Sequence, residues 1–500
     1  MELVRRAAQS TVATLISGQA RLHPDRVAIV DGDRRVTYGE LERRAHRLAN
    51  VLAQAGVGIG DRIALLTENR GEVLEVFLAA ARLGAIVACQ NWRLAPAELQ
   101  HCLALVAPVV AIVSPRHAAA ITLPAPIVLG EDYEARLAAA APVHPTIDVD
   151  PEAPLLILYT SGTTGLPKGA VLSHRAQIVR NLVTRAEFAV APDDTFVAWS
   201  PLYHMGAVDN SLGTLMAGGT VIVVDGFDPP RLAEIVASEA LGWLLLMPGM
   251  VGRFADELDR RGLRARSIRV CGVMADLVPP SEIARITTLL GAPYANTFGA
   301  TETGCPPCSS SLIPIGVAPE RLSKQQSPFC EIRLVDPEDR EVAPGAPGEL
   351  AMRGPTLFSG YWHNDAANTH DFRGGWFHMG DVFVRNPDGS LDFVDRVKYL
   401  IKSGGENIYP AELERVMLQD PRVAEVCVVR AADPKWGEVP IAFVARREDS
   451  LDEAALHALC RAQLAGFKQP KQIVFLPIAE FPRSASGKVQ RHELEKKVKR

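Results

Sequence analysis

Hydrophobic positions over the first 390 residues alternate between short apolar runs and longer segments with helical spacing. The short runs predict strands at Arg26–Val30, Arg35–Tyr38, Arg62–Thr67 and Ala85–Cys89. The longer segments predict helices from about Glu40 to Ala55 and from Glu72 to Leu83. Because strands and helices alternate, we expect an α/β architecture with largely parallel sheets in this part of the chain.

The pattern changes twice further along the chain. Near Glu331–Val335 and Gly348–Arg353, short strands between Pro and Gly turns predict a small β-barrel or β-subdomain. After Asp395 a separate α+β unit is predicted, with elements at Tyr399–Lys402, Pro410–Gln419, Ala424–Arg430, Ile441–Arg446 and Leu451–Leu464. A chain of 500 residues exceeds what one core supports. We therefore expect an N-terminal domain (1–395) of two α/β subdomains plus the β-barrel-like subdomain, and a C-terminal domain (399–500).

Composition is that of an ordinary globular protein, with 48% hydrophobic and 22% charged residues. The apolar run Leu105–Val113 is too short to span a bilayer and contains Pro108. Met1–Ala20 lacks a continuous apolar region and is predicted to form an amphipathic helix. We therefore expect a cytoplasmic protein without integral membrane association. The sequence leaves the oligomeric state open, and a homodimer is compatible with it.

Charge and cysteine usage bear on the partners. The net charge is −5, but the segment from Arg396 to Arg500 is net basic and the remainder is acidic. This asymmetry suits either a phosphate-rich small ligand or a merely solvated surface, and we expect no nucleic-acid partner. Eight scattered cysteines do not indicate a disulfide scaffold. For the one C-x-x-C pair, Cys305 and Cys308, a turn that happens to hold two thiols is favoured over a redox motif or a zinc site.

The most informative segment is Tyr159-Thr-Ser-Gly-Thr-Thr-Gly-Leu-Pro-Lys-Gly169, which follows the apolar strand Leu155–Leu158. Its glycines let backbone N–H groups approach an anion, while its hydroxyls and Lys168 add donors and a charge. This is the chemistry of a polyphosphate-binding loop. Because Lys168 is followed by Gly169, the Walker A order is absent, which disfavours a phosphotransferase. A flexible linker has a similar composition but would not follow a buried strand.

This segment resembles the signature of the adenylate-forming (AMP-binding) enzymes, which include acyl-CoA synthetases, adenylation domains and luciferases. Further motifs occur in the order found in that family: Ser200–His204, Thr297–Glu302, Gly375–Asp381, Asp395–Pro410 and Pro482–Lys488. The resemblance covers nearly the whole chain. It implies that ATP and a carboxylic acid form an acyl-adenylate, from which the acyl group passes to a thiol.

The resemblance implies a set of phosphate contacts: Thr160, Ser161, Gly162, Thr163, Thr164, Gly165 and Lys168. Thr301 is expected to contact the α-phosphate, and Glu302 to bind Mg²⁺. Lys488 matches the catalytic lysine that bridges the carboxylate and the phosphate during adenylation. Both reactants are anionic, so positioning and charge neutralisation are the chemistry that the site must supply.

Other residues match the positions that bind the nucleoside. Phe298, followed by Gly299, stands where the family usually has a Tyr against the adenine ring, so ring stacking is retained and a hydroxyl is lost. Asp381 matches the acceptor of the ribose hydroxyls, and Arg396 is expected nearby.

For the second half-reaction the resemblance implies a mobile C-terminal domain that rotates about a hinge at 396–398, with Lys398 as the hinge residue. Rotation is expected to withdraw Lys488 and to present a channel for the CoA thiol. The expected CoA contacts are Gly404, Gly405, Trp436, Phe467 and Lys471. Gln469 stands where an Arg can occur, which removes one phosphate contact.

His204 matches a position that borders the acid substrate, and the other expected wall positions are Met205, Asp209, Cys271–Ala275, Ala300 and Gly304. If Asp209 faces the pocket, it favours a hydroxylated or amine-bearing acid; a helix-capping role is the preferred alternative. Two segments, 271–279 and 323–328, depart from the family's motifs near the acyl and adenine pockets. Because no long insertion indicates a fatty-acid tunnel, an aromatic, alicyclic or medium-chain acid is favoured.

The sequence therefore predicts an ATP-dependent acid–CoA ligase that releases AMP and pyrophosphate. The alternative is a stand-alone adenylation enzyme that transfers the acyl group to a carrier-protein thiol or another nucleophile. Trp436 and the Gly404–Gly405 pair favour CoA as the acceptor. A catalytically silent acyl-AMP sensor is disfavoured because Glu302 and Lys488 are both present.

Overall fold

The computed structural model describes Val4 and residues 7–144, 147–161, 166–404, 406–483 and 489–498. The chain divides into two compact units. Unit 1 consists of Met1–Glu331 and Arg353–Phe372, and unit 2 of Ile332–Met352 and Arg373–Arg500. Each unit has its own sheets and its own buried core.

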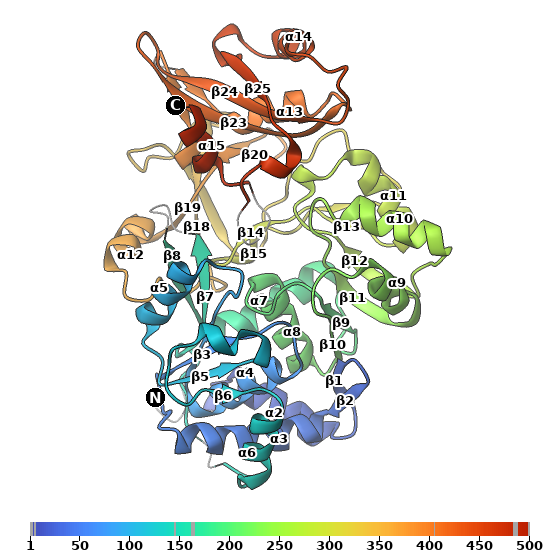
Figure 1. The fold of residues 1–500 in the computed structure, drawn as a ribbon, viewed down its shortest axis with the longest axis vertical. Helices are drawn as coiled ribbons and strands as arrows, with labels where there is room; N and C mark the ends of the chain where they lie inside the picture. Colours follow the sequence, from blue (N-terminus) through green and yellow to red (C-terminus); the bar gives the residue numbers. More distant parts are fainter. Residues whose placement is uncertain are drawn as a thin grey trace. The chain divides into compact units, whose positions relative to one another are not determined.

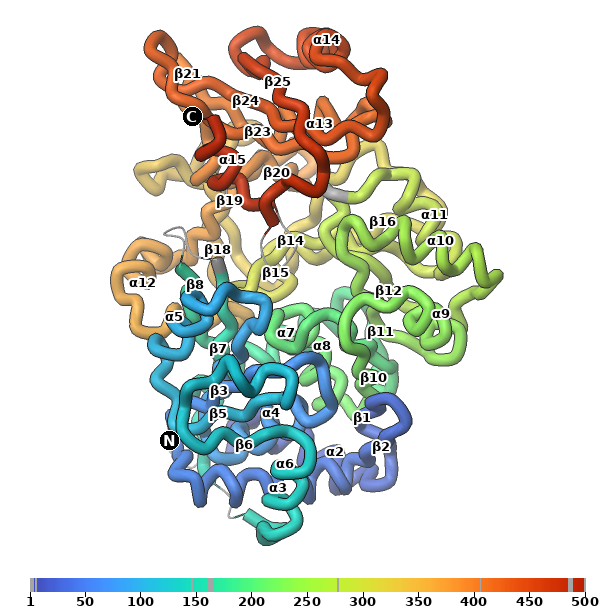
Figure 2. The backbone as a smooth tube through the Cα atoms, viewed as in Figure 1, coloured from blue at the N-terminus to red at the C-terminus, as the bar shows by residue number. Residues whose placement is uncertain are grey.

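The largest sheet of unit 1 has the strand order β6-β5-β3-β4-β7-β8 (Figures 1 and 2). Its strands are β3 (Arg62–Leu66), β4 (Ile86–Cys89), β5 (Val110–Val113), β6 (Ile127–Val128), β7 (Pro154–Ser161) and β8 (Pro167–Ser173). Neighbouring strands are parallel except β7 and β8, which are antiparallel. The side chains of β4 and β5 are all buried, as expected of parallel strands covered on both faces. The predicted parallel architecture is confirmed here.

Helices connect and cover these strands. They are α3 (Tyr38–Gln54), α4 (Glu72–Leu83), α5 (Pro96–Val106), α6 (Glu131–Ala139) and the 3-10 helix η1 (Pro115–Ala120). The predicted helix at 72–83 is confirmed with the same bounds. The N-terminal helix differs from the prediction, because α2 (Val12–Leu22) begins only after Thr11. The Thr11 hydroxyl accepts the Thr14 N–H at 3.3 Å and so caps the helix at that point.

Two four-stranded sheets complete the α/β part of unit 1, with the orders β2-β1-β10-β9 and β11-β12-β13-β16. Their strands are β1 (Val27–Asp31), β2 (Arg34–Thr37), β9 (Phe196–Ala198), β10 (Val221–Val223), β11 (Ala240–Leu244), β12 (Ser267–Cys271), β13 (Tyr294–Ala295) and β16 (Leu312–Ile313). A parallel bridge between Thr195 and Leu241 links the two sheets. The six-stranded sheet and this linked pair of sheets correspond to the two predicted α/β subdomains.

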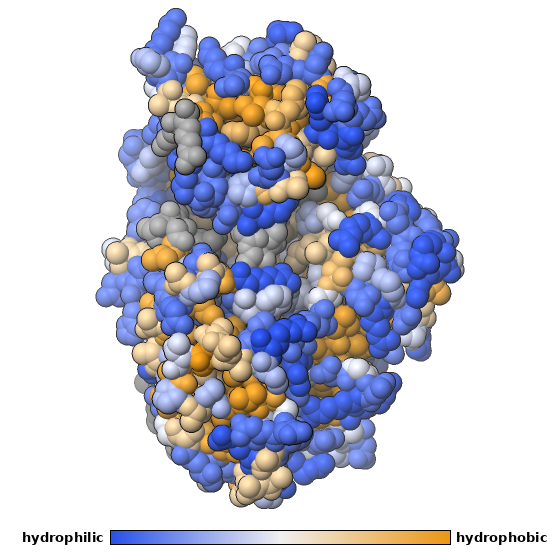
Figure 3. All heavy atoms as spheres, in the orientation of Figure 1, coloured by the Kyte–Doolittle hydropathy of each residue, from blue (hydrophilic) through white to orange (hydrophobic). Residues whose placement is uncertain are grey.

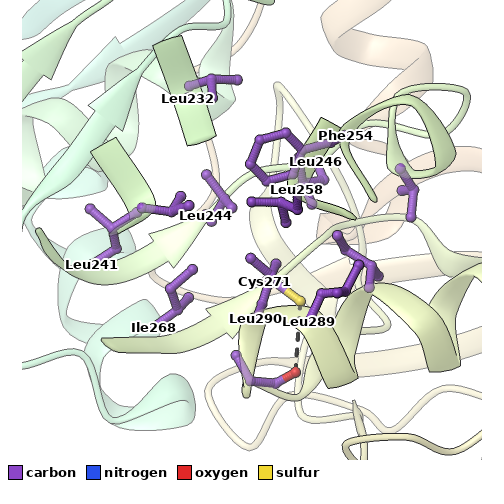
Figure 4. Packing of buried hydrophobic residues seen from close by; sticks show 14 of the residues in the cluster. Leu232, Leu241, Leu244, Leu246, Phe254, Leu258, Ile268, Cys271, Leu289 and Leu290 are labelled. Carbon is purple, nitrogen blue, oxygen red and sulfur yellow. Dashed lines mark hydrogen bonds between the residues drawn. The ribbon is translucent and has the colours of Figure 1, made fainter. Parts of the chain in front are cut away.

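The core beside β11 and β12 is formed by apolar residues from three helices, α9 (Pro229–Ser238), α10 (Val251–Arg261) and α11 (Pro280–Leu290). Figure 4 shows Leu246, Phe254 and Leu258 gathered in this core, and each is fully buried. Cys271 lies in the same core, with its Sγ 3.8 Å from the Ala292 carbonyl oxygen. Figure 3 shows hydrophilic residues over the outer surface of this region. The remaining elements of unit 1 are α7 (His174–Phe188), α8 (Met205–Ala217), η2 (Ala275–Leu277), β14 (Phe298–Ala300), β15 (Gly304–Cys308) and α12 (Asp365–Asp371).

Unit 2 contains two further sheets. The first has the order β17-β18-β19-β20, formed by β17 (Glu331–Val335), β18 (Pro347–Arg353), β19 (Phe377–Arg385) and β20 (Leu391–Arg396). The predicted strand at 331–335 is confirmed with the same bounds. Because β17 and β20 are both edge strands, the described strands form an open sheet rather than a closed barrel.

The C-terminal sheet has the order β22-β21-β24-β23, with β25 parallel to β24. Its elements are β21 (Ile401–Ser403), β22 (Glu406–Ile408), α13 (Pro410–Met417), β23 (Val423–Asp433), β24 (Gly437–Arg446), α14 (Glu453–Gln463), β25 (Gln472–Phe475) and α15 (Arg491–Val498). Short 3-10 helices are η3 (Arg373–Gly375), η4 (Val397–Tyr399), η5 (Gly466–Lys468) and η6 (Ile478–Glu480). The predicted α+β character of this segment is confirmed.

The border between the compact units does not fall at residue 395, since β18, β19 and β20 group with the C-terminal residues. Two hydrogen bonds show why. The Asp395 carboxylate accepts the Ala411 N–H at 2.7 Å, and the Arg415 guanidinium donates to the Phe393 carbonyl at 3.2 Å. This division describes compactness rather than motion, so the domain border at 395 and the hinge at 396–398 stay predictions.

None of the helices in the described part of the chain combines the length and the apolar character that a membrane crossing requires.

A buried histidine makes the stability of the fold depend on pH. The Nδ1 atom of His174 accepts the Val12 N–H at 3.3 Å, which requires a neutral ring, and burial lowers the His174 pKa to about 4. The unfolded chain binds this proton near pH 6.5. Stability from this residue is therefore fully present above pH 6.5 and is lost as the pH falls toward 4, by about 3 kcal/mol.

We expect His174→Gln to flatten this part of the pH profile of the unfolding free energy, measured by urea denaturation between pH 7 and pH 4. His23→Gln, at an exposed position, is the control and should leave the profile unchanged. A variant profile that stays as steep as that of the wild type would contradict the assignment.

Candidate active site

The predicted phosphate-binding segment forms a β-hairpin in unit 1. β7 and β8 are antiparallel, and Thr160 lies opposite Lys168 in the register. The first strand was predicted to end at Leu158, but its pairing with β8 continues to Ser161, which lies opposite Pro167. Thr160 and Lys168 therefore lie on paired strands rather than in a loop. Residues 162–165, which include Gly162, Thr163, Thr164 and Gly165, lie outside the described residues.

Lys168 meets an aromatic ring and a carboxylate. Its Nζ atom is 4.0 Å from the centroid of the Tyr361 ring and 3.4 Å from a carboxylate oxygen of Asp371. Tyr361 is brought to Lys168 by backbone pairing, since its segment runs beside β8. The Trp362 N–H donates to the Gly169 carbonyl at 2.8 Å, and Ala170 forms an antiparallel bridge with Tyr361.

Glu302 joins the same cluster through Tyr361. The Tyr361 hydroxyl donates to the Glu302 carboxylate at 3.0 Å, and Glu302 is only 9% exposed. Burial, together with the negative charges of Glu302 and Asp371, raises the pKa of Tyr361 far above its usual range. The hydroxyl therefore remains a donor to Glu302 at neutral pH. Lys168 and Glu302, predicted from two separate motifs, thus contact the ring and the hydroxyl of one tyrosine side chain.

Phe298, Gly299 and Thr301 lie on the short β14–β15 hairpin. The Ala300 N–H donates to the Thr303 hydroxyl at 2.9 Å, which tightens the turn that carries Thr301 and Glu302. A Cβ atom on Gly299 would lie 2.0 Å from the Gly304 carbonyl oxygen. Only glycine permits this approach of the two strands.

The C-x-x-C segment lies on β15, so the predicted turn is wrong. Neither Cys305 nor Cys308 is part of a disulfide in the described part of the chain, and burial raises the pKa of Cys305 to about 12. A thiol with so high a pKa is a poor nucleophile and a poor metal ligand. The Cys305 thiol is therefore suited to neither a redox role nor a zinc role.

Arg180 on α7 is a residue that the sequence analysis missed. Its side chain is 2% exposed, and its Nη1 atom lies 3.2 Å from an Asp209 carboxylate oxygen. The same guanidinium donates to the Thr301 carbonyl at 3.0 Å and to the Thr356 carbonyl at 2.9 Å. Arg180 therefore fixes the Thr301–Glu302 turn through its hydrogen bond to the Thr301 carbonyl. Its position on a helix offered no signal, because an arginine at helical spacing usually marks a solvated face.

Asp209 does not cap a helix, as the sequence analysis preferred. It lies inside α8, whose N-cap is His204. Its carboxylate forms an ion pair with Arg180 and accepts a hydrogen bond from the Gln177 amide at 2.9 Å. Burial raises the pKa of Asp209, while these two partners oppose that shift.

His204 stands at the start of α8, with its ring centroid 4.8 Å from that of Tyr203. A second residue that the sequence did not reveal, Asn69, holds the segment between β9 and His204. The Asn69 amide donates to the Ser200 carbonyl at 2.8 Å, and its side-chain oxygen accepts the Leu202 N–H at 2.8 Å. Met205 follows His204 on the first turn of α8.

The predicted pocket wall begins at Cys271, the last residue of β12, and ends at Ala275, the first residue of η2. Two aromatic side chains hold it: the Trp243 indole N–H donates to the Gly272 carbonyl at 3.0 Å, and the Tyr294 hydroxyl donates to the Val273 carbonyl at 3.0 Å. Ala300 and Gly304, the other expected wall positions, lie on β14 and β15. The sequence identified none of these supporting bonds.

In unit 2 the structure brings Asp381 and Arg396 together, as expected. They lie opposite each other on β19 and β20, and the Arg396 Nε atom is 3.0 Å from an Asp381 carboxylate oxygen. Lys398 lies on η4, with its Nζ atom 5.0 Å from the Tyr399 ring centroid.

The structure also brings Gly404 and Trp436 together. The Gly404 N–H donates to the Trp436 carbonyl at 2.7 Å, and a Cβ atom on Gly404 would lie 2.7 Å from the indole ring. The Asp433 carboxylate accepts the Lys435 and Trp436 N–H groups at 2.8 Å and 2.9 Å, which holds the indole in a turn with 40% of the residue exposed. Gly405 lies outside the described residues.

The remaining predicted residues are on the same C-terminal sheet and its connections. Phe467 is 44% exposed on η5, and Lys471 directly precedes β25, where its N–H donates to the Pro440 carbonyl at 2.8 Å. Hydrogen bonds from the Trp436 and Lys435 backbone N–H groups are the main cause that lowers the pKa of Asp433. The positive charge of Lys471 lowers it further. Lys488 lies outside the described residues, while Val489 directly after that segment forms a bridge with Arg483.

Comparison with known proteins agrees with this arrangement. Residues 16–362 match the family model of the AMP-binding enzymes, and residues 412–488 match that of the AMP-binding enzyme C-terminal domain. A feruloyl-CoA synthase from Amycolatopsis sp is 36% identical over 485 residues, covering 96% of this chain and 97% of the relative. An indoleacetate–CoA ligase from Aromatoleum aromaticum is 34% identical, covering 97% and 98%.

Among solved structures, the o-succinylbenzoate CoA synthetase from Bacillus subtilis in complex with its acyl-adenylate intermediate superposes with a TM-score of 0.84. It is 26% identical, with coverage of 96% of this chain and 97% of that structure. The family match, the full-length relatives and the shared fold together show that the chain belongs to the AMP-binding, adenylate-forming enzymes, in their acyl- and aryl-CoA ligase branch.

Proposed function

We propose that this chain is an ATP-dependent ligase that joins an aryl or arylalkanoic acid to CoA through an enzyme-bound acyl-adenylate. The observation that carries the proposal is the cluster in which Tyr361 contacts both Lys168 and Glu302. The cation of the phosphate-binding hairpin and the carboxylate of the Thr301–Glu302 turn both contact this one side chain, and polyphosphate chemistry needs a cation and a metal-binding carboxylate in one site.

In the first half-reaction a carboxylate oxygen of the acid attacks the α-phosphorus of ATP, and pyrophosphate leaves with the bonding electron pair. Both reactants are negatively charged, so neutralisation in a water-poor site supplies most of the rate. We assign phosphate binding to Thr160 and Lys168, and the α-phosphate contact to Thr301. Arg180 supports this assignment because it holds the Thr301 carbonyl at 3.0 Å.

Glu302 is the residue of this chain that would hold Mg²⁺. The described residues contain no group of three His, Cys, Asp or Glu side chains arranged to bind a metal. One carboxylate suits Mg²⁺, which usually takes one or two carboxylates together with substrate phosphates and water. The bound ion would neutralise charge on the phosphates. The Tyr361 hydroxyl orients Glu302 by its hydrogen bond of 3.0 Å.

In the second half-reaction the CoA thiolate attacks the acyl carbonyl, and AMP leaves to give a thioester. We assign the CoA contacts to four residues of the C-terminal segment: Gly404, Trp436, Phe467 and Lys471. The support is chemical: an indole on a residue that is 40% exposed offers a stacking face, and the absence of a side chain on Gly404 lets the indole lie directly against the backbone there. Lys488 and the hinge at Lys398 are assigned from the family's motifs.

The acid class follows from two arguments. The relatives at 36% and 34% identity are named for feruloyl and indoleacetate substrates, both aryl acids. The charge of Asp209 is engaged by Arg180, so this carboxylate is not left to select a cationic substrate. The named wall residues that remain, such as Met205, Val273 and Ala275, are apolar and suit a ring.

The first expected outcome concerns turnover. With ATP and Mg²⁺, aryl and arylalkanoic acids should support acid-dependent AMP release that requires CoA and yields a thioester, whereas long fatty acids should not. AMP release and thioester formation are measured over a panel of aryl, alicyclic, fatty and hydroxylated acids. Glu302→Gln is the control and should lower turnover at least about 100-fold. Acid-dependent pyrophosphate exchange without CoA turnover would favour a carrier-protein thiol as the acceptor instead.

A second outcome concerns Asp209. Asp209→Asn should leave the ratio of kcat/KM between aryl and amine-bearing acids within about threefold, because its charge serves Arg180 rather than the substrate. Arg180→Met should lower the free energy of unfolding by about 3–5 kcal/mol, since it leaves a buried carboxylate without its cation. Chemical denaturation measures the second effect. A large change of acid preference in Asp209→Asn would contradict this assignment and would indicate that Asp209 contacts the acid substrate.

A third outcome separates the two half-reactions. Lys488→Ala should lower acid-dependent pyrophosphate exchange at least about 100-fold and leave most of the thioester step when acyl-adenylate is supplied. Trp436→Ala should do the reverse, raising the KM for CoA about tenfold and leaving that for ATP unchanged. Equal loss of both steps in Lys488→Ala would refute its assignment to adenylation, and an unchanged KM for CoA would remove Trp436 from the CoA site.

A further inference from the structure

The two segments that depart from the family's motifs, 271–279 and 323–328, meet in unit 1. They are separated by more than 40 residues in the chain, yet the Lys324 Nζ atom lies 2.6 Å from a carboxylate oxygen of Asp276. Asp276 directly follows the predicted pocket wall, Cys271–Ala275. The two departures are therefore one structural feature rather than two independent ones.

Lys324 is completely buried, whereas the Asp276 side chain is 30% exposed. A lysine is rarely buried unless its charge is paired, because removing an ammonium group from water costs several kcal/mol. The folded state therefore requires a negatively charged group next to the buried Lys324 ammonium group, and Asp276 supplies it. That requirement draws the segment around Asp276 toward Lys324.

Asn296 is the second partner of the lysine. The Lys324 Nζ atom donates to the Asn296 side-chain oxygen at 2.5 Å. The Asn296 amide in turn donates to the carbonyls of Leu322 at 3.1 Å and Ser323 at 3.2 Å. Asn296 is buried and lies two residues before Phe298, the residue assigned to the adenine ring. One ammonium group therefore touches both the residue that directly follows the pocket wall and the residue that directly precedes the Thr297–Glu302 motif.

The wall itself has an unfavourable backbone conformation that needs support. Met274 has a φ of +52°, a left-handed conformation that costs a non-glycine residue free energy. The aromatic donors Trp243 and Tyr294 hold the wall on the side before Met274, at Gly272 and Val273. On the side after Met274, the bond between Asp276 and Lys324 supplies the corresponding support.

We propose that Lys324 is a positioning residue that sets acid selectivity by fixing the wall 271–275 against the adenine motif, through Asp276 and Asn296. This inference rests on the proposed ligase function. Lys324 touches no reacting atom; it acts through the shape of the wall. Loss of its charge is expected to loosen the wall and to weaken the discrimination between acids of different width.

The test compares Lys324→Met, Asp276→Asn and the double variant in acid-dependent pyrophosphate exchange, with a narrow and a wide aryl acid. Lys324→Met should raise the KM for the better acid about tenfold and bring the kcat/KM ratio of the two acids toward one. The KM for CoA, measured separately in thioester formation, should stay within twofold. The double variant should recover part of the selectivity, because it no longer leaves the carboxylate without a cation.

Arg34→Met is the matched control. It removes a cation on β2 that lies 2.9 Å from the buried Glu75 of α4, so it tests for a general effect of destabilisation in unit 1. Unchanged acid selectivity in Lys324→Met, or an equal change in Arg34→Met, would overturn the inference and leave the ligase standing. A wild-type protein that activates no acid in the panel would overturn the proposed function, and this inference with it.

Discussion

A buried guanidinium controls the geometry of the candidate site. Arg180 contacts the Asp209 carboxylate and the carbonyls of Thr301 and Thr356, and the two carbonyls lie more than a hundred residues from it in the chain. An arginine enclosed to this degree cannot lose its partners without a cost of several kcal/mol. The turn that carries Thr301 and Glu302 is therefore held in place by an electrostatic requirement, in addition to the apolar core beneath it.

The same principle recurs at each edge of the site in unit 1. Lys168 is held between Tyr361 and Asp371, and Lys324 between Asp276 and Asn296. Each cation joins segments that are distant in the chain. Loops beyond the ends of parallel strands have little core of their own, so directional, charged contacts are an effective way to fix them. The site thus combines a conventional apolar core with a polar framework that positions the functional groups.

Unit 2 positions its candidate residues by backbone geometry instead. The turn that carries Trp436 is held by hydrogen bonds from the backbone N–H groups of Lys435 and Trp436 to the Asp433 carboxylate. The indole lies close against Gly404. Asp381 and Arg396 face each other because β19 and β20 are in register. The two arrangements differ in burial, since Asp381 is enclosed whereas the Trp436 residue stays 40% exposed.

The local sequence determined the regular elements and the order of the motifs. Apolar periodicity defined the helix at 72–83 and the strand at 331–335 to the residue, because both patterns are set by neighbours in the chain. Even the hairpin partners Thr160 and Lys168 belong to one motif, although the strand proved longer than predicted. These features depend on short-range sterics and on which face of an element is apolar.

Only the tertiary structure decided which polar residues are buried and with whom. Arg180 and Asn69 look like surface residues in the sequence, Asp209 looks like a helix cap, and the C-x-x-C pair looks like a turn. Each was misjudged or missed because burial of a polar group depends on partners that are remote in the chain. The pairing of Lys324 with Asp276 is the clearest case: the sequence marked both segments as unusual, but only folding brings the two charges to 2.6 Å.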